Sequence, residues 1–330
     1  MDIKKYQGVI PAFYACYDDA GSISPERTRA LARHLLDKGV KGLYVGGSPG
    51  ECIYHSVAER KVVLENVMAE LGGKLTIIAH VACNITADSQ ELARHAEGLG
   101  VDAIAAIPPI YFHLPPYGIA GYWNDISAAA PSTDFIIYNI PQLAGVSLTP
   151  SLLAEMQKNP KVIGVKNSSM PTQDIQMWKD QGGSNFVVMN GPDEQLVSGL
   201  AIGATGGIGG TYAVMPELFL KIWELFYACL LYTSGEHIPA QLIGAEEVGQ
   251  GGRLGHGAQV GGEGVVGGDQ GRQDAGQEDN CEHHDTYDGQ PVLHHFADCA
   301  AGFALTQPAS LLGVPELVEL PVQTGAPSCC

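Results

Sequence analysis

Short apolar runs recur along the first two thirds of the chain, and each is followed by a stretch with apolar residues at helical spacing. The runs are rich in β-branched residues, Ala and Gly and do not alternate with polar positions, as in parallel strands buried on both faces. We expect strands at residues 9–15, 42–47, 75–81, 103–107, 135–139, 162–168, 185–190 and 206–210.

The stretches between these runs carry helix start and stop signals. Ser24, Pro25 and Glu26 provide an N-cap, a first-turn proline and an acidic residue, and Gly39 ends that helix. We expect helices at residues 25–38, 57–71, 86–100, 118–130, 150–158, 172–181, 194–202 and 216–231. This alternation predicts the α/β class and a (β/α)8 TIM barrel. A doubly wound open sheet is the alternative, but residues 46–50 do not match its GxGxxG phosphate loop.

Composition divides the chain into residues 1–231 and residues 232–330. The second part holds 18 of the 42 glycines, and its 14 acidic residues face only two basic ones, Arg253 and Arg272. Such a segment buries too little apolar surface to offset its chain entropy, so we expect a disordered or weakly folded tail. We hypothesise that this tail is non-native to the barrel and stems from a frameshift or a chimeric reading frame, and residues 229–234 resemble translated adaptor sequence.

The tail also contains a group of potential metal ligands, namely Cys281, His283, His284, Asp285, His294, His295 and Cys299. Their spacing matches no zinc pattern, so a chance gathering in a biased composition is the preferred interpretation. We therefore predict no metal site.

The formal net charge of −18 argues against nucleic acid or an anionic membrane as a partner. The first residues lack the apolar core of a signal peptide, and no apolar run is long enough to span a bilayer. The cysteines at positions 16, 52, 83 and 229 are scattered through predicted elements, as in reduced thiols. These features predict a cytoplasmic protein.

Lys166 stands near the end of the apolar run 162–168. Because burying an ammonium is costly, this position favours a neutral amine, which can attack a ketone and form a Schiff base. A lysine that merely extends to water is the simpler interpretation for this strand alone.

Other strands of a barrel deliver their ends to the same mouth. Ser48 follows the second strand, Tyr138 ends the fifth, Ser168 follows Lys166, and Asp193 with Glu194 follow the seventh. An amine, a phenol, hydroxyls and carboxylates together suit enamine chemistry on a keto acid. Asp193 and Glu194 could equally be an acidic pair at a helix N-terminus.

Four motifs carry a resemblance to a known family, and they are Gly46-Gly47-Ser48-Pro49-Gly50-Glu51, Tyr138-Asn139-Ile140-Pro141, Gly164-Val165-Lys166-Asn167-Ser168 and Gly206-Gly207-Ile208-Gly209. In this order they resemble the class I pyruvate aldolases related to N-acetylneuraminate lyase and dihydrodipicolinate synthase, over about residues 3–231.

The resemblance implies a lyase that needs no cofactor, because Lys166 itself forms the Schiff base with pyruvate. It implies that Tyr138 relays the proton and that Ser48 with the following backbone amide holds the pyruvate carboxylate, next to Pro49. It further implies that Tyr111 crosses a subunit interface, in an assembly expected to be a homotetramer.

Two positions discriminate within the family. Leu143 stands where dihydrodipicolinate synthases place an arginine, and leucine offers no carboxylate clamp. Gly191, Asp193 and Glu194 resemble the residues with which sialic acid lyases bind the polyhydroxyl tail of the sugar, for which carboxylates are suitable acceptors. Cleavage of N-acetylneuraminate to pyruvate and N-acetylmannosamine is therefore the leading hypothesis.

The chain departs from the family at three places. Pro49 replaces a hydroxyl residue and has no N–H, Gly210 replaces a serine of sialic acid lyases, and the tail shows no counterpart of the family's C-terminal helices. Three alternatives thus stay open: a pyruvate aldolase for a different aldehyde, a dihydrodipicolinate synthase-like enzyme, and an inactive barrel that serves as a binding module.

Overall fold

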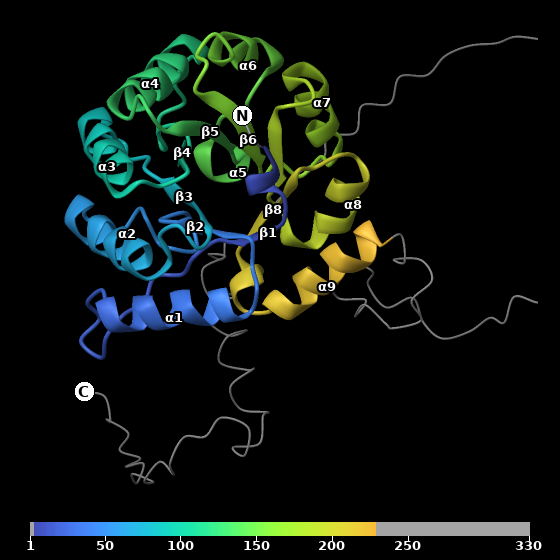
Figure 1. The fold of residues 1–330 in the computed structure, drawn as a ribbon. Helices are drawn as coiled ribbons and strands as arrows, with labels where there is room; N and C mark the ends of the chain where they lie inside the picture. Colours follow the sequence, from blue (N-terminus) through green and yellow to red (C-terminus); the bar gives the residue numbers. More distant parts are fainter. Residues whose placement is uncertain (1–2, 229–330) are drawn as a thin grey trace, which may run out of the picture. The chain divides into compact units, whose positions relative to one another are not determined.

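The structure is a computed structural model and describes residues 3–228. Eight parallel strands form one sheet in the order β1-β8-β7-β6-β5-β4-β3-β2 (Figure 1). Their bounds are Val9–Pro11 (β1), Gly42–Val45 (β2), Thr76–His80 (β3), Ala103–Ala106 (β4), Asp134–Asn139 (β5), Val162–Asn167 (β6), Val187–Asn190 (β7) and Gly206–Gly209 (β8).

The two ends of this sheet meet, which makes the sheet a barrel. Ala12 pairs with Tyr44 in a parallel bridge, and the Phe13 N–H donates to the Tyr44 carbonyl at 2.9 Å. This closure confirms the TIM-barrel prediction and excludes the open doubly wound sheet. The first strand is shorter than expected, because after Pro11 only this bridge continues the pairing.

Helices surround the barrel as a ring (Figure 1). They are α1 (Pro25–Asp37), α2 (Val57–Leu71), α3 (Thr86–Leu99), α4 (Pro116–Ala129), α5 (Pro141–Ala144), α6 (Pro150–Met156), α7 (Gln173–Gly182), α8 (Leu196–Ala201) and α9 (Pro216–Tyr227). The predicted start of α1 is confirmed, because the Ser24 hydroxyl accepts from the Arg27 N–H. A reciprocal capping box of Ser56 and Glu59 begins α2.

Some boundaries differ from the prediction. The short helix α5 and the 3-10 turns η1 (Ile3–Tyr6), η2 (Asp193–Gln195) and η3 (Thr211–Ala213) were not expected. The sequence predicts a single helix over residues 194–202, whereas η2 occupies its first turn and α8 follows. These segments are too short for a hydrophobic period to reveal them.

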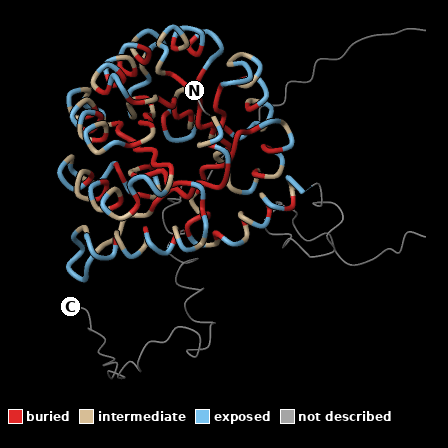
Figure 2. The backbone as a smooth tube through the Cα atoms, viewed as in Figure 1, coloured by how far each residue is buried: buried red, intermediate tan, exposed pale blue. Residues whose placement is uncertain are grey.

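Two apolar cores lie on the two faces of the sheet, and Figure 2 shows the strands as a buried ring. Side chains between the sheet and the helices form the larger core, which includes Leu43, Ile104 and Val165. The smaller core fills the barrel, and it includes Tyr44 and Tyr138. Successive residues of a strand therefore serve different cores, so the position of a residue along its strand decides whether it faces the barrel interior.

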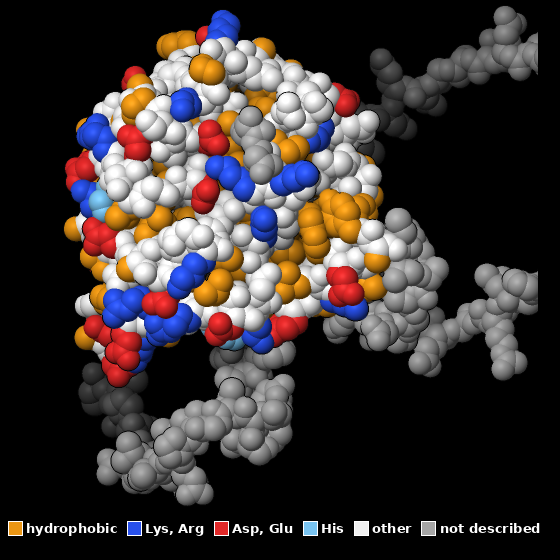
Figure 3. Space-filling view, viewed as in Figure 1, with side chains coloured by type: hydrophobic (Ala, Val, Ile, Leu, Met, Phe, Trp, Pro, Cys, Tyr) orange, Lys and Arg blue, Asp and Glu red, His pale blue; other side chains and the backbone are white. Residues whose placement is uncertain are grey.

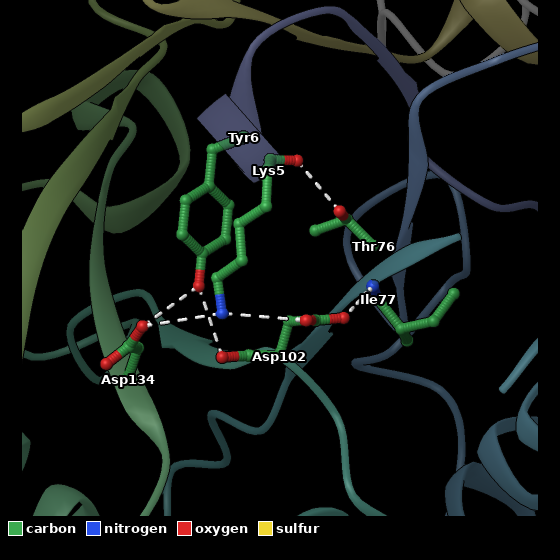
Figure 4. A network of polar contacts seen from close by, with 6 residues as sticks. All are labelled: Lys5, Tyr6, Thr76, Ile77, Asp102 and Asp134. Atoms are coloured by element: carbon green, nitrogen blue, oxygen red, sulfur yellow. Dashed lines mark hydrogen bonds and ion pairs between the residues drawn. The ribbon is translucent and has the colours of Figure 1, made fainter. Parts of the chain in front are cut away.

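The N-terminal end of the barrel is closed by η1 and a polar network (Figure 4). The Tyr6 hydroxyl donates to the Asp102 carbonyl and the Asp134 carboxylate, both at 3.1 Å. Lys5 Nζ lies 3.5 Å from Asp102 and 3.7 Å from Asp134, and the Thr76 hydroxyl donates to the Lys5 carbonyl. Charged side chains of both signs gather around the middle of this face in Figure 3.

Several sequence-based expectations lie outside the described residues. They concern the tail at residues 232–330, its Cys and His group, the end of the last predicted helix, and the place of the family's C-terminal helices. Within residues 3–228, no helix has the length and apolar character needed to cross a membrane.

Candidate active site

The pairing of β5 with β6 brings Tyr138 and Lys166 together. The two residues are direct partners in the register, so their side chains project from the same face of the sheet into the barrel. Lys166 is only 4% exposed, and its Nζ lies 3.6 Å from the centroid of the Tyr138 ring. An amine and a phenol thus share one buried site, as the strand ends predicted.

These two side chains reach a cavity of about 290 Å³ at the C-terminal mouth. Most of the predicted site residues line it, namely Ser48, Pro49, Tyr138, Lys166, Ser168, Gly191, Glu194 and Gly210. Two larger hollows, of about 600 and 410 Å³, contain neither Lys166 nor Tyr138. The smaller cavity is the candidate active site because the reactive groups lie in it.

The turn that carries Ser48 is held by a hydrogen bond from His80. Gly46 has a φ of 74°, a left-handed conformation suited to glycine, and its carbonyl lies 2.8 Å from His80 Nδ1. The Ile107 N–H donates to His80 Nε2, so Nδ1 carries the proton that bonds to Gly46. Burial, followed by the nearby Arg60, lowers the pKa of His80 to about 3. A neutral imidazole therefore holds the Ser48 turn.

Gly191 lies directly against Ser168. A Cβ atom at position 191 would overlap the Ser168 hydroxyl oxygen, and the Gly191 N–H donates to the Asn167 carbonyl at 2.8 Å. Glycine is therefore required for the loop after β7 to approach the end of β6 this closely.

Asp193 is placed differently from its neighbour Glu194. Its carboxylate accepts from the Thr211 N–H at 2.7 Å and from the Thr211 hydroxyl at 2.6 Å, and so joins η2 to η3. Burial raises the pKa of Asp193, and these hydrogen bonds oppose the rise. Asp193 does not line the cavity, whereas the exposed Glu194 does. The binding role expected for Asp193 stays a prediction.

Tyr111 and Leu143 both lie at the surface. Tyr111 is 85% exposed, adopts a φ of 83° and contacts Phe112 edge to face, and it does not line the candidate cavity. Leu143, on α5, is 59% exposed, and its neighbour Gln142 lines the cavity. An aliphatic side chain therefore stands next to a residue that lines the mouth.

Three asparagines that were not predicted to matter end β5, β6 and β7. Asn139, Asn167 and Asn190 are register partners across these strands. Asn139 Nδ2 donates to Asn167 Oδ1 at 2.8 Å, and Trp178 Nε1 donates to the same oxygen at 3.0 Å. Each asparagine directly follows an inward-facing residue, so the row fixes the strand ends that carry Tyr138 and Lys166. The repeated Asn at successive strand ends was the available signal.

Comparison with known proteins gives a consistent result. The profile of the Dihydrodipicolinate synthetase family matches residues 5–241. The chain is 70% identical over 227 residues to N-acetylneuraminate lyase of Mediterraneibacter gnavus, covering 69% of this chain and 72% of the relative. It is 38% identical over 220 residues to N-acetylneuraminate lyase 2 of Escherichia coli O6:H1, covering 67% and 72%.

Comparison with solved structures gives the same result as comparison with sequences. Wild-type Ruminococcus gnavus sialic acid aldolase superposes with a TM-score of 0.68 at 70% identity, over 68% of this chain and 75% of that one. The catalytic lysine mutant of the same aldolase gives a TM-score of 0.69 at 69% identity, over 69% and 75%. The chain belongs to the Dihydrodipicolinate synthetase family.

Proposed function

We propose that this chain is a Schiff-base lyase that cleaves N-acetylneuraminate to pyruvate and N-acetylmannosamine, with Lys166 as the nucleophile. The observation that carries the proposal is the placement of Lys166 and Tyr138 as register partners at one cavity. The 70% identity to a protein named N-acetylneuraminate lyase supports the choice of substrate. No cofactor is needed, because the lysine itself supplies the electron sink.

The chemistry follows from these groups. The Lys166 amine attacks the ketone carbon of the open-chain substrate, a C–N bond forms, and the ketone oxygen leaves as water. A base then removes the proton of the hydroxyl two carbons away, the carbon–carbon bond between them breaks, and the aldehyde leaves. The electron pair enters the iminium to give an enamine, which takes a proton on carbon, and water releases pyruvate. Tyr138, beside the amine, relays the protons between the reacting oxygen and the substrate carboxylate.

The remaining cavity residues divide between the two ends of the substrate. Ser48 is suited to hold the pyruvate carboxylate, and Pro49 provides no N–H beside it. Glu194 and Ser168 offer oxygen acceptors to a polyhydroxyl tail, with Gly191 leaving room for Ser168. Asp193 would act through its bond to Thr211. This division favours a sugar over a second substrate that carries a carboxylate.

The test is reductive trapping with pyruvate and borohydride, followed by peptide mass spectrometry and parallel substrate assays. We expect the label on Lys166, none in Lys166→Ala, and cleavage of N-acetylneuraminate without condensation of aspartate semialdehyde. A label on another lysine contradicts the assignment. A label on Lys166 without cleavage of the sugar points to a different aldehyde, and no label at all would leave the barrel as a binding module.

We also propose that the enzyme is a homo-oligomer, a tetramer by family resemblance, in which Tyr111 reaches a second copy. Tyr111, Phe112, Ile53 and Tyr54 are exposed apolar side chains in the loops after β4 and β2. Such exposure is typical of a surface that a partner covers. Sedimentation of the full chain checks this proposal, and a monomer at assay concentration contradicts it.

We propose, too, that residues 1–231 are the catalytic domain and that residues 232–330 take no part in catalysis. Every residue assigned a role above lies within the barrel that spans residues 3–228. Resequencing the source DNA from independent clones tests whether the two parts share one reading frame.

A further inference from the structure

Lys166 is buried among aromatic rings. Besides Tyr138, its Nζ lies 4.7 Å from the centroid of the Tyr44 ring. Within residues 3–228 the Lys166 nitrogen makes neither a hydrogen bond nor an ion pair. Its close contacts are the faces of these two rings. The carboxylate of Asp193, a charged group near this site, is already bonded to Thr211.

Tyr44 is held in this position from several sides. It is fully buried at the end of β2, and its backbone closes the barrel through the bridge to Ala12. Its ring meets the Tyr138 ring edge to face, with centroids 5.8 Å apart and an interplanar angle of 81°. On its other side lies Gly47, where a Cβ would come within 2.7 Å of the ring. The ring therefore has little freedom to turn away from Lys166.

A third ring completes this surrounding. The His80 imidazole meets Tyr138 at 6.0 Å and 85° and Tyr44 at 6.1 Å and 38°. With its pKa lowered to about 3 by burial and by Arg60, His80 stays neutral and adds no competing positive charge. The lysine nitrogen thus lies over the rings of Tyr44 and Tyr138, and His80 packs against both of these rings.

We infer that Tyr44 is a further catalytic residue for the covalent step, and that the face of its ring stabilises the positive charge of the iminium formed on Lys166. The inference rests on the proposed function. An iminium is a cation, and among the described residues no carboxylate forms an ion pair with Lys166 Nζ, so the two ring faces and the substrate's own carboxylate are left to stabilise it. The negative face of an aromatic ring attracts such a cation, and most strongly where water is excluded.

The hydroxyl of Tyr44 is not needed for this role. Among the described residues it is buried without a hydrogen-bond partner. Tyr44→Phe keeps the ring face and removes only this hydroxyl, whereas Tyr44→Leu keeps apolar volume and removes the ring. The two variants therefore separate the ring face from the hydroxyl, and the ring from simple packing.

The test measures the pyruvate concentration that gives half-maximal borohydride trapping on Lys166 in the full chain. We expect Tyr44→Phe to stay within about twofold of wild type, and Tyr44→Leu to need about 2- to 30-fold more pyruvate. Phenylalanines with increasing numbers of ring fluorines at position 44 should raise the concentration stepwise, because fluorine withdraws charge from the ring face at nearly constant shape. This series keeps the test decisive if Tyr44→Leu does not fold.

Tyr6 provides the matched control. It is a buried tyrosine with Lys5 Nζ 4.9 Å from its ring centroid, at the opposite end of the barrel. The same fluorinated series at position 6 should leave the half-maximal pyruvate concentration unchanged.

The inference would be overturned if the half-maximal pyruvate concentration did not change along the fluorinated series at position 44. It would also be overturned if Tyr44→Phe raised this concentration as much as Tyr44→Leu. Failure of the wild-type chain to trap pyruvate on Lys166 would instead overturn the proposed function, so the two failures are distinguishable.

Discussion

The two ends of the barrel treat buried and half-buried polar groups in opposite ways. At the N-terminal end, Tyr6, Lys5, Asp102 and Asp134 satisfy one another, and each charge there faces an opposite charge (Figure 4). At the C-terminal end, Lys166 faces ring faces, and the Tyr44 hydroxyl has no partner within the described barrel. One end is arranged for stability, and the other keeps groups available for a substrate, as expected where function overrides local satisfaction.

The largest expected effect tests the C-terminal end. Tyr138→Phe removes the proton relay and should lower the turnover of N-acetylneuraminate by about 10²- to 10⁴-fold. The free energy of unfolding should change little, because the Tyr138 hydroxyl makes no hydrogen bond to another residue of the described barrel. Coupled pyruvate detection and urea denaturation measure the two quantities. Turnover near that of wild type would mean that a different group moves the proton.

The N-terminal end should give the reverse pattern. Tyr6→Phe leaves the Asp102 carbonyl and the Asp134 carboxylate without this donor, at a cost of about 1–3 kcal/mol in the free energy of unfolding. Turnover of the folded protein should equal that of wild type. Urea denaturation and steady-state kinetics on one preparation check both statements, and a loss of kcat in the folded variant would break the contrast between the two ends.

Low pH should destabilise the fold through His80, which lies at the C-terminal end of the barrel. The pKa of His80 is about 3 in the folded protein against about 6.5 when unfolded, so the unfolded state binds the extra proton between these values. The free energy of unfolding should therefore fall as pH drops below about 6.5, by about 2 kcal/mol between about pH 7 and about pH 5. His80→Asn, which can still donate to the Gly46 carbonyl, should show a shallower slope in urea denaturation. Equal slopes would assign the acid sensitivity to other groups.

The smallest expected effect concerns specificity. A Cβ at Gly210 would lie 3.4 Å from the Pro49 ring, so side chains at these two positions occupy adjoining space. Gly210→Ser and Pro49→Ser should therefore be non-additive, with a coupling of about 0.5–1 kcal/mol, or about two- to fivefold in kcat/KM. Gly210→Ser combined with the distant Tyr6→Phe should be additive. Additivity in both cycles would show that positions 49 and 210 act independently.

The sequence was sufficient to predict the barrel and the pair at its centre. Uninterrupted apolar runs separated by helical stretches predict parallel strands, and a polar residue at the end of such a run, as at Lys166 and Tyr138, predicts the mouth. The identity of the strand neighbours was not needed, because every strand of a barrel delivers its end to the same side.

The rest depended on contacts between distant segments. Tyr44 and His80 have the sequence pattern of ordinary strand residues, and only the closed barrel brings the Tyr44 ring to Lys166 and the His80 ring to Tyr138. Asp193 and Glu194 are adjacent in sequence, yet the turn η2 turns one to Thr211 and leaves the other at the cavity. A local pattern cannot distinguish these outcomes, because the backbone of a short 3-10 turn decides them.

The row of Asn139, Asn167 and Asn190 has a consequence for how this barrel can change over evolution. The three asparagines are hydrogen-bonded and do not line the catalytic cavity, while the residue before each of them, Tyr138, Lys166 or Met189, faces the barrel interior. The residue that anchors a strand end and the residue that faces the barrel interior are therefore neighbours in the sequence, but their side chains lie on opposite faces of the sheet. A mutation can exchange an inward residue while its strand end stays held, so new substrates can be explored on this rim without rebuilding it.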